Sequence, residues 1–246
     1  ANGNLLTVKN GYSSPMVIEI NAMKETVWQY GPIQANSAVR LANGNTLITD
    51  SGAPGYPFKP RIIEVSEDKK IVWSYEYKTR AEAPRFAERL ANGNTLIVNP
   101  GKVTEITRDK KEVWSYSKDL VYPVKAVRLA NGNTMIVDKG LNGGKVVEVD
   151  KAGKITWQYG NNTKGTALGQ LAGPTDAIRL ADGTTIIVDL DSARILSVTS
   201  NKDISSIIHW QDVLKDLSVL NIWGAYPASE EEIILSLSYT NGRPAL

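Results

Sequence analysis

Cysteine is absent from this chain, and its 246 residues include a single histidine, His209. Without cysteine the protein has no disulfide bonds, no thiolate metal ligands and no cysteine nucleophile. With only one histidine it also lacks the ligands of a structural zinc site or of a His-rich catalytic metal site. We therefore expect neither a metal nor a cofactor.

Long apolar runs and an excess of one charge are missing as well. No segment approaches the ~18 consecutive apolar residues of a membrane-spanning helix, so we expect no membrane span. The 28 basic and 26 acidic residues leave a net charge of +2, which gives no electrostatic reason to expect nucleic acid as a partner. Apolar residues make up 42% of the chain, enough for a substantial core.

A repeat is the main feature that the sequence does have. The nine residues RLANGNTLI occupy positions 40–48 and return unchanged at 89–97, with close copies at 128–136 and 179–187. The repeat begins near residues 1, 42, 91, 130, 181 and 228, so its period is roughly 40–50 residues. Each unit also contains an apolar segment that ends in tryptophan, at Trp28, Trp73, Trp114, Trp157 and Trp210.

The composition of each repeat predicts four β-strands. Segments such as NTLIVN, RIIEV and KIVW alternate in polarity and are rich in β-branched residues. The Asn-Gly pair between the first two strands predicts a two-residue type I′ hairpin turn. Four antiparallel strands at this period are typical of a β-propeller blade. We therefore predict one all-β domain over residues 1–246, a β-propeller of four-stranded antiparallel blades.

The predicted number of blades comes from counting strands. The second-strand segment occurs six times if EIILSLS near Ile233 is included, which favours six blades. Five blades, with a terminal strand left over, is the alternative. The one expected helix is the short amphipathic stretch from Trp210 to Leu220.

Residues that recur at one repeat position are expected to share one structural role. Packing between adjacent blades is predicted for the four tryptophans at one repeat position, Trp28, Trp73, Trp114 and Trp157. His209, beside Trp210 on the expected outer strand, is interpreted as a surface or structural residue. The recurring arginines are predicted to pair with the recurring glutamates of the third strands, and the alternative is a ring of arginines that binds an anion. The two sets are Arg40, Arg89, Arg128 and Arg179, and Glu19, Glu64, Glu105 and Glu148.

The repeat resembles those of known propeller families. The strings L-x-N-G-N-T-L-I-x-D, V-I-E-V-D and G-K-I-V-W-x-Y are similar to repeats of arylsulfotransferase-like and PQQ-like or NHL-like propellers. In arylsulfotransferase-like relatives this resemblance implies a His-Asp pair just before the innermost strand. With no histidine at the matching positions we expect no sulfuryl transfer, and with so few repeats no PQQ. The matching pairs are Asn36-Ser37, Arg85-Phe86, Val124-Lys125 and Thr175-Asp176.

The candidate ligand site is the channel mouth, where the first strands of propeller blades converge. The loops that lead into these strands vary in length while the hairpins stay constant, as expected of functional loops on a fixed scaffold. They span residues 31–37, 76–86, 117–125, 160–176 and 211–224. The candidate ligand-binding residues at their ends are Ser37, Arg85, Phe86, Lys125, Asp176 and Trp223. This set suits an acidic or sugar-like ligand, and the alternative is a water-filled mouth without a ligand.

These observations favour a non-enzymatic propeller scaffold that binds a protein or a small ligand at the channel mouth. The expected location is extracellular, periplasmic or on the surface of a prokaryotic cell. Two alternatives belong to other functional classes. One is an arylsulfotransferase-like or lyase-like propeller enzyme, and the other is a carbohydrate-binding module.

Overall fold

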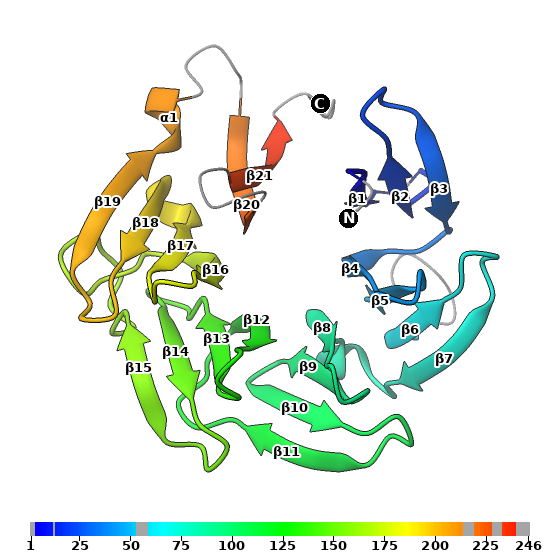
Figure 1. Cartoon of the computed structure of the whole chain (residues 1–246), viewed down its shortest axis with the longest axis horizontal. Coiled ribbons are helices and arrows are strands. Elements are labelled where there is room, and N and C mark those ends of the chain that lie inside the picture. The colour runs from blue at the N-terminus through cyan, green and yellow to red at the C-terminus, as the bar shows by residue number, and fades with distance from the viewer. Residues whose placement is uncertain (1–2, 12, 53–58, 214–218, 228–232, 240–246) are drawn as a thin grey trace. The chain divides into compact units, whose positions relative to one another are not determined.

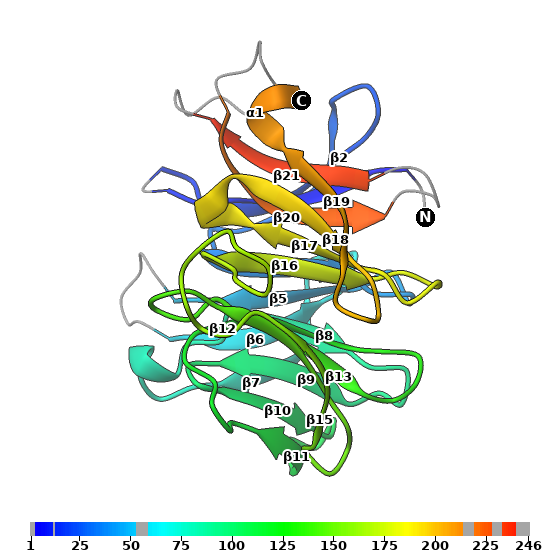
Figure 2. The same cartoon turned by 90° about the vertical axis from the view of Figure 1, so that its left-hand side faces the viewer.

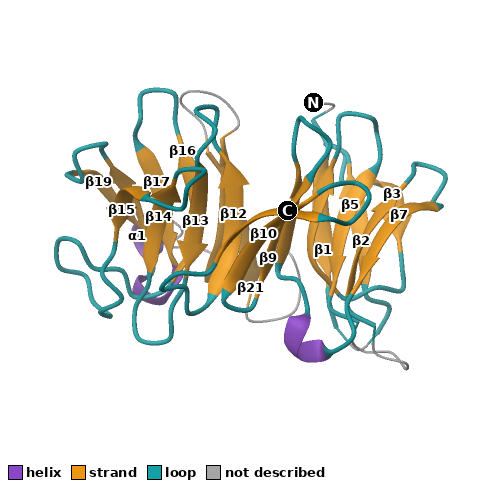
Figure 3. Cartoon of the chain, turned by 90° about the horizontal axis from the view of Figure 1, so that it is seen from below, coloured by secondary structure: helices purple, strands orange, loops and turns teal. Residues whose placement is uncertain are grey.

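The computed structural model describes residues 3–11, 13–52, 59–213, 219–227 and 233–239, with side chains up to Asp212 (Figure 1). The chain divides into two compact units, Ala1–Ser117 and Lys118–Leu246. In the described ranges almost all regular structure is β, and the helices are single turns (Figure 3). None of these helices is long and apolar enough to cross a membrane.

The unit of residues 1–117 contains three antiparallel sheets, each with its strands in chain order. A three-stranded sheet comes first, followed by two four-stranded sheets. A 3₁₀ turn, η1 (Arg80–Glu82), lies in the connection before β8. The strands are β1 (Leu5–Lys9), β2 (Met16–Ile20) and β3 (Thr26–Tyr30), then β4 (Ala35–Arg40), β5 (Thr46–Asp50), β6 (Arg61–Val65) and β7 (Ile71–Glu76), then β8 (Phe86–Arg89), β9 (Thr95–Asn99), β10 (Lys102–Ile106) and β11 (Glu112–Tyr116).

The unit of residues 118–246 contains two further four-stranded sheets and a two-stranded one. The four-stranded sheets are β12 (Pro123–Arg128), β13 (Thr134–Asp138), β14 (Lys145–Val149) and β15 (Ile155–Tyr159), and β16 (Pro174–Arg179), β17 (Thr185–Asp189), β18 (Arg194–Val198) and β19 (Ile204–His209). A 3₁₀ turn, η2 (Leu190–Ser192), joins β17 to β18. Helix α1 (Trp210–Val213) then leads to β20 (Val219–Pro227) and β21 (Ile233–Tyr239). Strand β20 packs beside β16 and β17, as Figure 2 shows.

The predicted fold class is confirmed as an all-β propeller of four-stranded antiparallel blades. The described strands form five blades, the number given as the alternative to six. Four blades are complete, the β1–β3 sheet is the fifth, and the sixth second-strand segment pairs only with β20. Of the predicted helix over 210–220, the structure describes α1 (Trp210–Val213), residues 214–218 lie outside the described part of the chain, and Val219 and Leu220 belong to β20. The run Val-Leu-Asn-Ile-Trp is rich in residues that favour strands, which overrides the amphipathic spacing.

The Asn-Gly turns differ from the predicted type I′ hairpin. Gly44 donates its N–H to the Leu41 carbonyl at 3.0 Å, and Leu41 donates to the Asn45 carbonyl at 2.8 Å. The loop therefore has three residues, and only Gly44, at φ 84°, takes the left-handed conformation. Asn43 instead accepts the Asn45 N–H through its side chain at 3.1 Å. This is the type I turn followed by a left-handed glycine that three-residue hairpins commonly use.

The core lies between successive blades. All five residues of β5, β13 and β17 are buried, because the middle strands of a blade have neighbours on both faces. Leu47 and Ile62 of one blade pack with Ile97 of the next, and Met135 packs with Ile187 in the same way. Each such side chain contributes about 1.5–3 kcal/mol when fully buried. Blade-to-blade packing is therefore a major source of stability.

Candidate functional site

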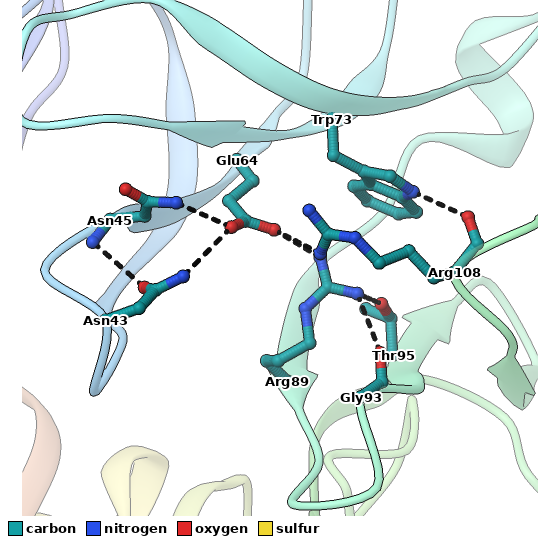
Figure 4. Close-up of polar contacts among 8 residues, drawn as sticks. All are labelled: Asn43, Asn45, Glu64, Trp73, Arg89, Gly93, Thr95 and Arg108. Carbon is teal, nitrogen blue, oxygen red and sulfur yellow. Dashed lines mark hydrogen bonds and ion pairs between the residues drawn. The ribbon is translucent and has the colours of Figure 1, made fainter.

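The repeated arginine, glutamate and tryptophan form a cluster between adjacent blades, called here the Arg–Glu–Trp cluster. Figure 4 shows the copy around Glu64. The guanidinium of Arg89, from the next blade, pairs with Glu64 at 2.9 Å and lies 4.6 Å from the centre of the Trp73 ring. The Trp73 indole N–H donates to the Arg108 carbonyl at 2.8 Å, and the Arg108 side chain pairs with Glu64 at 2.7 Å. Asn45 donates to the same carboxylate at 2.7 Å.

The cluster recurs at other contacts between blades. Arg40 pairs with Glu19 and lies 4.7 Å from the Trp28 ring centre. The corresponding contact places a guanidinium nitrogen of Arg179 at 3.1 Å from Glu148. The predicted Arg–Glu pairing is confirmed at these places, and each arginine reaches the glutamate of the preceding blade. Trp28 and Trp73 are 8% exposed and Trp157 is 7% exposed, which confirms their packing role. Trp114, for which the same burial was predicted, is only partly buried in β11. These three arginines hold blades together, so the anion-ring alternative has no support from them.

Two of the cluster glutamates have lowered pKa values. Burial alone would raise the pKa of Glu64, but hydrogen bonds from Arg108 and Asn45 and the charges of Arg89 and Arg108 outweigh it. Burial is likewise outweighed at Glu148 by hydrogen bonds from two asparagines and by the charge of Arg179, which lower its pKa. Both glutamates are therefore held as carboxylates, as a structural ion pair requires.

The prediction that Trp210 ends the outer strand of its blade is wrong. In the last four-stranded blade Ser206 pairs with Ser197, in the register where Trp157 pairs with Glu148 one blade earlier. Trp210 instead begins α1 and is buried in a cluster with Ile186, Val188, Leu190 and Ile195. The sequence pattern was misleading because the tryptophan follows the outer strand rather than lying within it.

The first-strand position that precedes a shared alanine differs from blade to blade. Each of four first strands ends in Ala-x-Arg, and the residue before this alanine is Ser37, Phe86, Lys125 or Asp176. In β4, β12 and β16 the strand register shifts immediately before this residue. Such an irregularity re-aims a side chain. Because the neighbouring alanine and arginine are shared by all four blades, this position is the natural place for a role specific to one blade.

Two of the predicted site residues come together in the unit of residues 118–246. The ammonium of Lys125 on β12 forms an ion pair with the carboxylate of Asp176 on β16, in the adjacent blade. The Lys125 side chain is 15% exposed and the Asp176 side chain 3% exposed. The lysine is thus the more accessible partner, with the aspartate behind it.

Buried aspartates at the ends of second strands hold the loops beside this pair. Asp138 accepts the backbone N–H groups of residues 121 and 122 at 2.9 and 2.6 Å. Asp189 accepts the Gly173 N–H at 2.8 Å and pairs with Arg194 at 2.9 Å. Arg194 is only 2% exposed and donates to carbonyl groups of the loop over residues 160–173. The segments that lead into β12 and β16 are therefore fixed by charged side chains.

Sequence reasoning missed these aspartates, although a signal for them was present. Three second strands close on an acidic residue, in the strings NTLITD, NTMIVD and TTIIVD. In the other unit Asp50 accepts the Gly52 N–H at 2.8 Å and pairs with Arg61 at 3.0 Å. In these three blades the acidic residue accepts backbone N–H groups of a loop next to its second strand.

The remaining predicted site residues lie elsewhere. Ser37 shares a hydrogen bond of 2.7 Å with Thr49 inside its own blade, and Arg85 and Phe86 are partly buried at the start of β8. Trp223 falls in β20, where side chains are outside the described part of the chain. A surface hollow of about 310 Å³ lies in the same unit as Ser37, but no predicted site residue lines it.

No nucleophile and base are paired at the Thr175-Asp176 position. Within the described residues the buried Thr175 hydroxyl makes no hydrogen bond, and Asp176 pairs with Lys125. His209 is exposed at the end of the outer strand β19, as predicted. The described part of the chain also contains no group of three His, Cys, Asp or Glu side chains suited to hold a metal ion.

No protein-family model matches the chain, and no curated protein matches its sequence. Solved structures do match its fold. A protein of unknown function from Bacteroides caccae has a TM-score of 0.70 at 14% identity, over 95% of this chain and 82% of that one. A streptogramin B lyase has a TM-score of 0.66 at 13% identity, over 96% and 76% of the two chains. At these identities the likeness establishes the propeller fold alone.

A third similar structure is an auxiliary nutrient binding protein from Bacteroides ovatus. It has a TM-score of 0.58 at 14% identity, over 83% of this chain and 54% of that one. The matched structures therefore include a binding protein as well as a lyase. The same propeller architecture serves different functions in them, so function must be argued from the residues of this chain.

Proposed function

We propose that this protein is a non-enzymatic scaffold that binds a small, hydroxyl-bearing ligand at the Lys125–Asp176 pair. The observation that carries this proposal is the place of the pair in the repeat. Lys125 and Asp176 occupy a first-strand position that changes from blade to blade beside an alanine that all four blades share, and they form an ion pair across two adjacent blades. The residues that repeat, in contrast, are used in contacts between and within blades.

The chemistry of the pair favours a neutral polar ligand over an acidic one. A lysine ammonium offers up to three N–H donors, and a carboxylate offers only acceptor sites. A sugar or polyol hydroxyl both donates and accepts, so it is able to bond to both groups without adding charge. An acidic ligand would instead bring a second negative charge close to Asp176, which weakens its binding.

The surroundings of the pair support binding rather than catalysis. The loops beside it are held by Asp138 and by the buried Asp189–Arg194 pair, so little ordering is left to occur when a ligand binds. Thr175 has no hydrogen-bonded base, and the single histidine lies on an outer strand. A binding function also agrees with the auxiliary nutrient binding protein among the similar structures.

The test is a thermal-shift and calorimetric titration with glucose, galactose, sucrose, glycerol and, as the acidic comparison, succinate. We expect at least one neutral compound to raise the Tm of the wild-type protein, and Lys125→Gln to abolish that rise. Lys139→Gln is the matched control, because Lys139 also pairs with an aspartate in this unit, at 3.1 Å from Asp191. If no compound raises the Tm, or if the rise is unchanged in Lys125→Gln, the proposal is wrong.

A further inference from the structure

The chain contains several Asn-Gly pairs, in which the asparagine is able to lose its amide without an enzyme. The backbone nitrogen of the glycine attacks the side-chain carbonyl carbon of the asparagine, ammonia leaves, and a cyclic succinimide remains. Water then opens the ring at either carbonyl and gives aspartate or isoaspartate. Glycine favours the attack because it has no Cβ to hinder it. Asparagine is accordingly one of the thermolabile residues of proteins.

Three of these pairs lie in repeated turns that the structure describes, and hydrogen bonds there restrain both reacting groups. Gly132 donates its N–H to the Leu129 carbonyl at 2.9 Å, so the nitrogen that must attack is already engaged. The Asn131 side chain accepts the Asn133 N–H at 3.0 Å and donates to Glu148 at 3.0 Å. The same hydrogen bonds restrain the other two pairs of the repeated turns, Asn43-Gly44 and Asn92-Gly93.

The pair Asn142-Gly143 lacks these restraints. It lies in the connection between β13 and β14, where Asn142 is exposed and Gly143 has a φ of 98°. Among the residues that the structure describes, neither the Asn142 side chain nor the Gly143 N–H has a hydrogen-bond partner. Gly143 is itself buried, but the carbonyl that it attacks belongs to the residue before it. The reaction at this pair therefore has no hydrogen bond to break first.

Hydrogen bonding, and not exposure, separates this pair from those of the repeated turns. The asparagines of the three turns are exposed as well, namely Asn43, Asn92 and Asn131. Asn10-Gly11 is intermediate, because Asn10 donates to the Ala35 carbonyl at 2.8 Å while the Gly11 N–H lies 3.4 Å from Gln34 Oε1. The remaining Asn-Gly pairs begin outside the described ranges, at Asn2 and Asn241.

We propose that Asn142 is a site of spontaneous modification, at which the amide is lost faster than at the asparagines of the repeated turns. The product has a carboxylate in place of the Asn142 amide, as aspartate or as isoaspartate. The modification is therefore selected by the fold among pairs that have the same two residues.

The isoaspartyl product should loosen the loops around it, because it adds one atom to the backbone just before two buried glycines. A Cβ on Gly143 would lie 2.3 Å from the Lys164 nitrogen, which shows how little room the backbone has there. Gly144 donates its N–H to the Leu171 carbonyl at 3.2 Å and so helps to hold the loop over residues 160–173. A displaced Gly144 would weaken this contact.

The test is peptide mapping by mass spectrometry on the full chain after incubation in warm, mildly alkaline buffer. The mass gained when an amide becomes an acid identifies each asparagine that has reacted. We expect Asn142 to react roughly tenfold faster or more than the asparagines of the three repeated turns, because each of those must first break several hydrogen bonds.

The same chain unfolded in urea is the control. Every Asn-Gly pair should react at a similar rate there, because the residue that attacks is glycine in each and no fold restrains it. A folded chain in which Asn142 reacts no faster than the asparagines of the repeated turns would overturn the proposal. So would a difference that persists in urea, since it would arise from the local sequence.

Asn142→Gln separates the effect of this site from that of the other pairs. Glutamine keeps the amide and is tolerated at an exposed position without contacts, but its longer side chain forms the corresponding ring far more slowly. After equal incubation we expect the Tm of the wild type to fall and that of Asn142→Gln to fall much less. Equal changes in the two proteins, with Asn142 shown to have reacted, would contradict the expected effect of isoaspartate on the loops.

Discussion

The blade β16–β19 differs from the blades whose third and fourth strands contribute to an Arg–Glu–Trp cluster. The Arg–Glu–Trp clusters combine an arginine from the next blade, a buried glutamate, a tryptophan and one or two asparagines from the Asn-Gly-Asn turn. In β16–β19 the turn has Asp182, the glutamate position has Ser197 and the tryptophan position has Ser206. The asparagine, the glutamate and the tryptophan of the cluster are thus all replaced in this one repeat.

The joint change shows that the cluster acts as one unit. Asn131 and Asn133 both donate to Glu148, at 3.0 and 2.7 Å. An aspartate in place of Asn131 would set a second carboxylate against Glu148, whereas Asp182 has only Ser197 on the matching strand position and meets no such repulsion. Without a glutamate at position 197 there is no ion pair to hold an arginine at this place, and a tryptophan at position 206 would have no guanidinium to pack against. The apolar cluster around Trp210 lies within this blade, between β17, β18, η2 and α1.

Removing a cluster tryptophan should have the largest effect of the changes considered. We expect Trp73→Ala to lower the free energy of unfolding by about 3–5 kcal/mol, the range for truncating a large buried aromatic side chain. The ring packs against Arg89 and its N–H bonds to Arg108. Ser206→Ala, at the same position of the blade without the cluster, should change it by less than about 0.5 kcal/mol. Urea denaturation measures the free energy of unfolding of both variants. Equal losses in Trp73→Ala and Ser206→Ala would contradict the proposed difference between blades with and without the cluster.

Removing the cluster carboxylate should be nearly as costly. Glu64→Ala leaves the mostly buried Arg89 without its partner, and breaking a buried ion pair in this way costs about 3 kcal/mol. The control is Glu112→Ala, which breaks the exposed pair with Lys102 and should cost less than about 1 kcal/mol. A Glu64→Ala variant as stable as the control would show that apolar packing alone holds these blades.

The clusters should also make stability depend on acid pH. Because the folded-state pKa values of Glu64 and Glu148 lie below the ordinary value of 4.5, their contribution is fully present above that value and is lost as the pH falls toward the lowered pKa values. We expect the free energy of unfolding to fall below about pH 4.5. The fall should be smaller in Glu64→Gln, which cannot be protonated at this position. An identical pH profile for the two proteins would contradict the assignment.

Repetition in the sequence made the structural part of the molecule predictable. The strands, the Arg–Glu pairing and the burial of Trp28, Trp73 and Trp157 followed from residues that recur at one position, since repeated residues have repeated neighbours. Repetition failed where the last blade departs from the pattern. Trp210 continued the spacing in the sequence, but the strand register places Ser206 at the tryptophan position.

The sequence predicted single residues of the candidate site but not the contacts between them. Loop position identified Lys125 and Asp176 separately, yet their ion pair joins residues 51 positions apart on two blades, and no local pattern encodes such a contact. The buried Asp189–Arg194 pair was missed for a related reason. Its partners are backbone groups of a long irregular loop, and backbone groups leave no mark in the sequence.

The turn asparagine provides a smaller test of the same comparison. Asn131→Asp keeps the hydrogen bond from the Asn133 N–H but loses the donor to Glu148 and adds a like charge. We expect a cost of about 1–3 kcal/mol, typical of an unsatisfied polar contact. Asp182→Asn, the reverse change one blade later, should stay within about 0.5 kcal/mol of the wild type. A cost for Asp182→Asn equal to that for Asn131→Asp would show that the turn, and not the facing glutamate, sets the preference.

The turns between third and fourth strands should give the smallest effect, and the same one in both kinds of blade. Lys110 and Lys202 hold the left-handed conformation at φ 67° and 73°, and Gly153 holds it at 80° in the blade β12–β15. This conformation costs a side-chain-bearing residue roughly 1–2 kcal/mol, while glycine loses roughly 0.5–1 kcal/mol more entropy than alanine on folding. Lys110→Gly and Lys202→Gly should therefore each stabilise the protein by less than about 1 kcal/mol. Both turns accept the indole N–H of a tryptophan of the preceding blade, at the carbonyls of Arg108 and Ser200, and the two lysines hold the same position in them. Urea denaturation should therefore give the same gain for both, and a gain in only one blade would contradict the equivalence of the two turns.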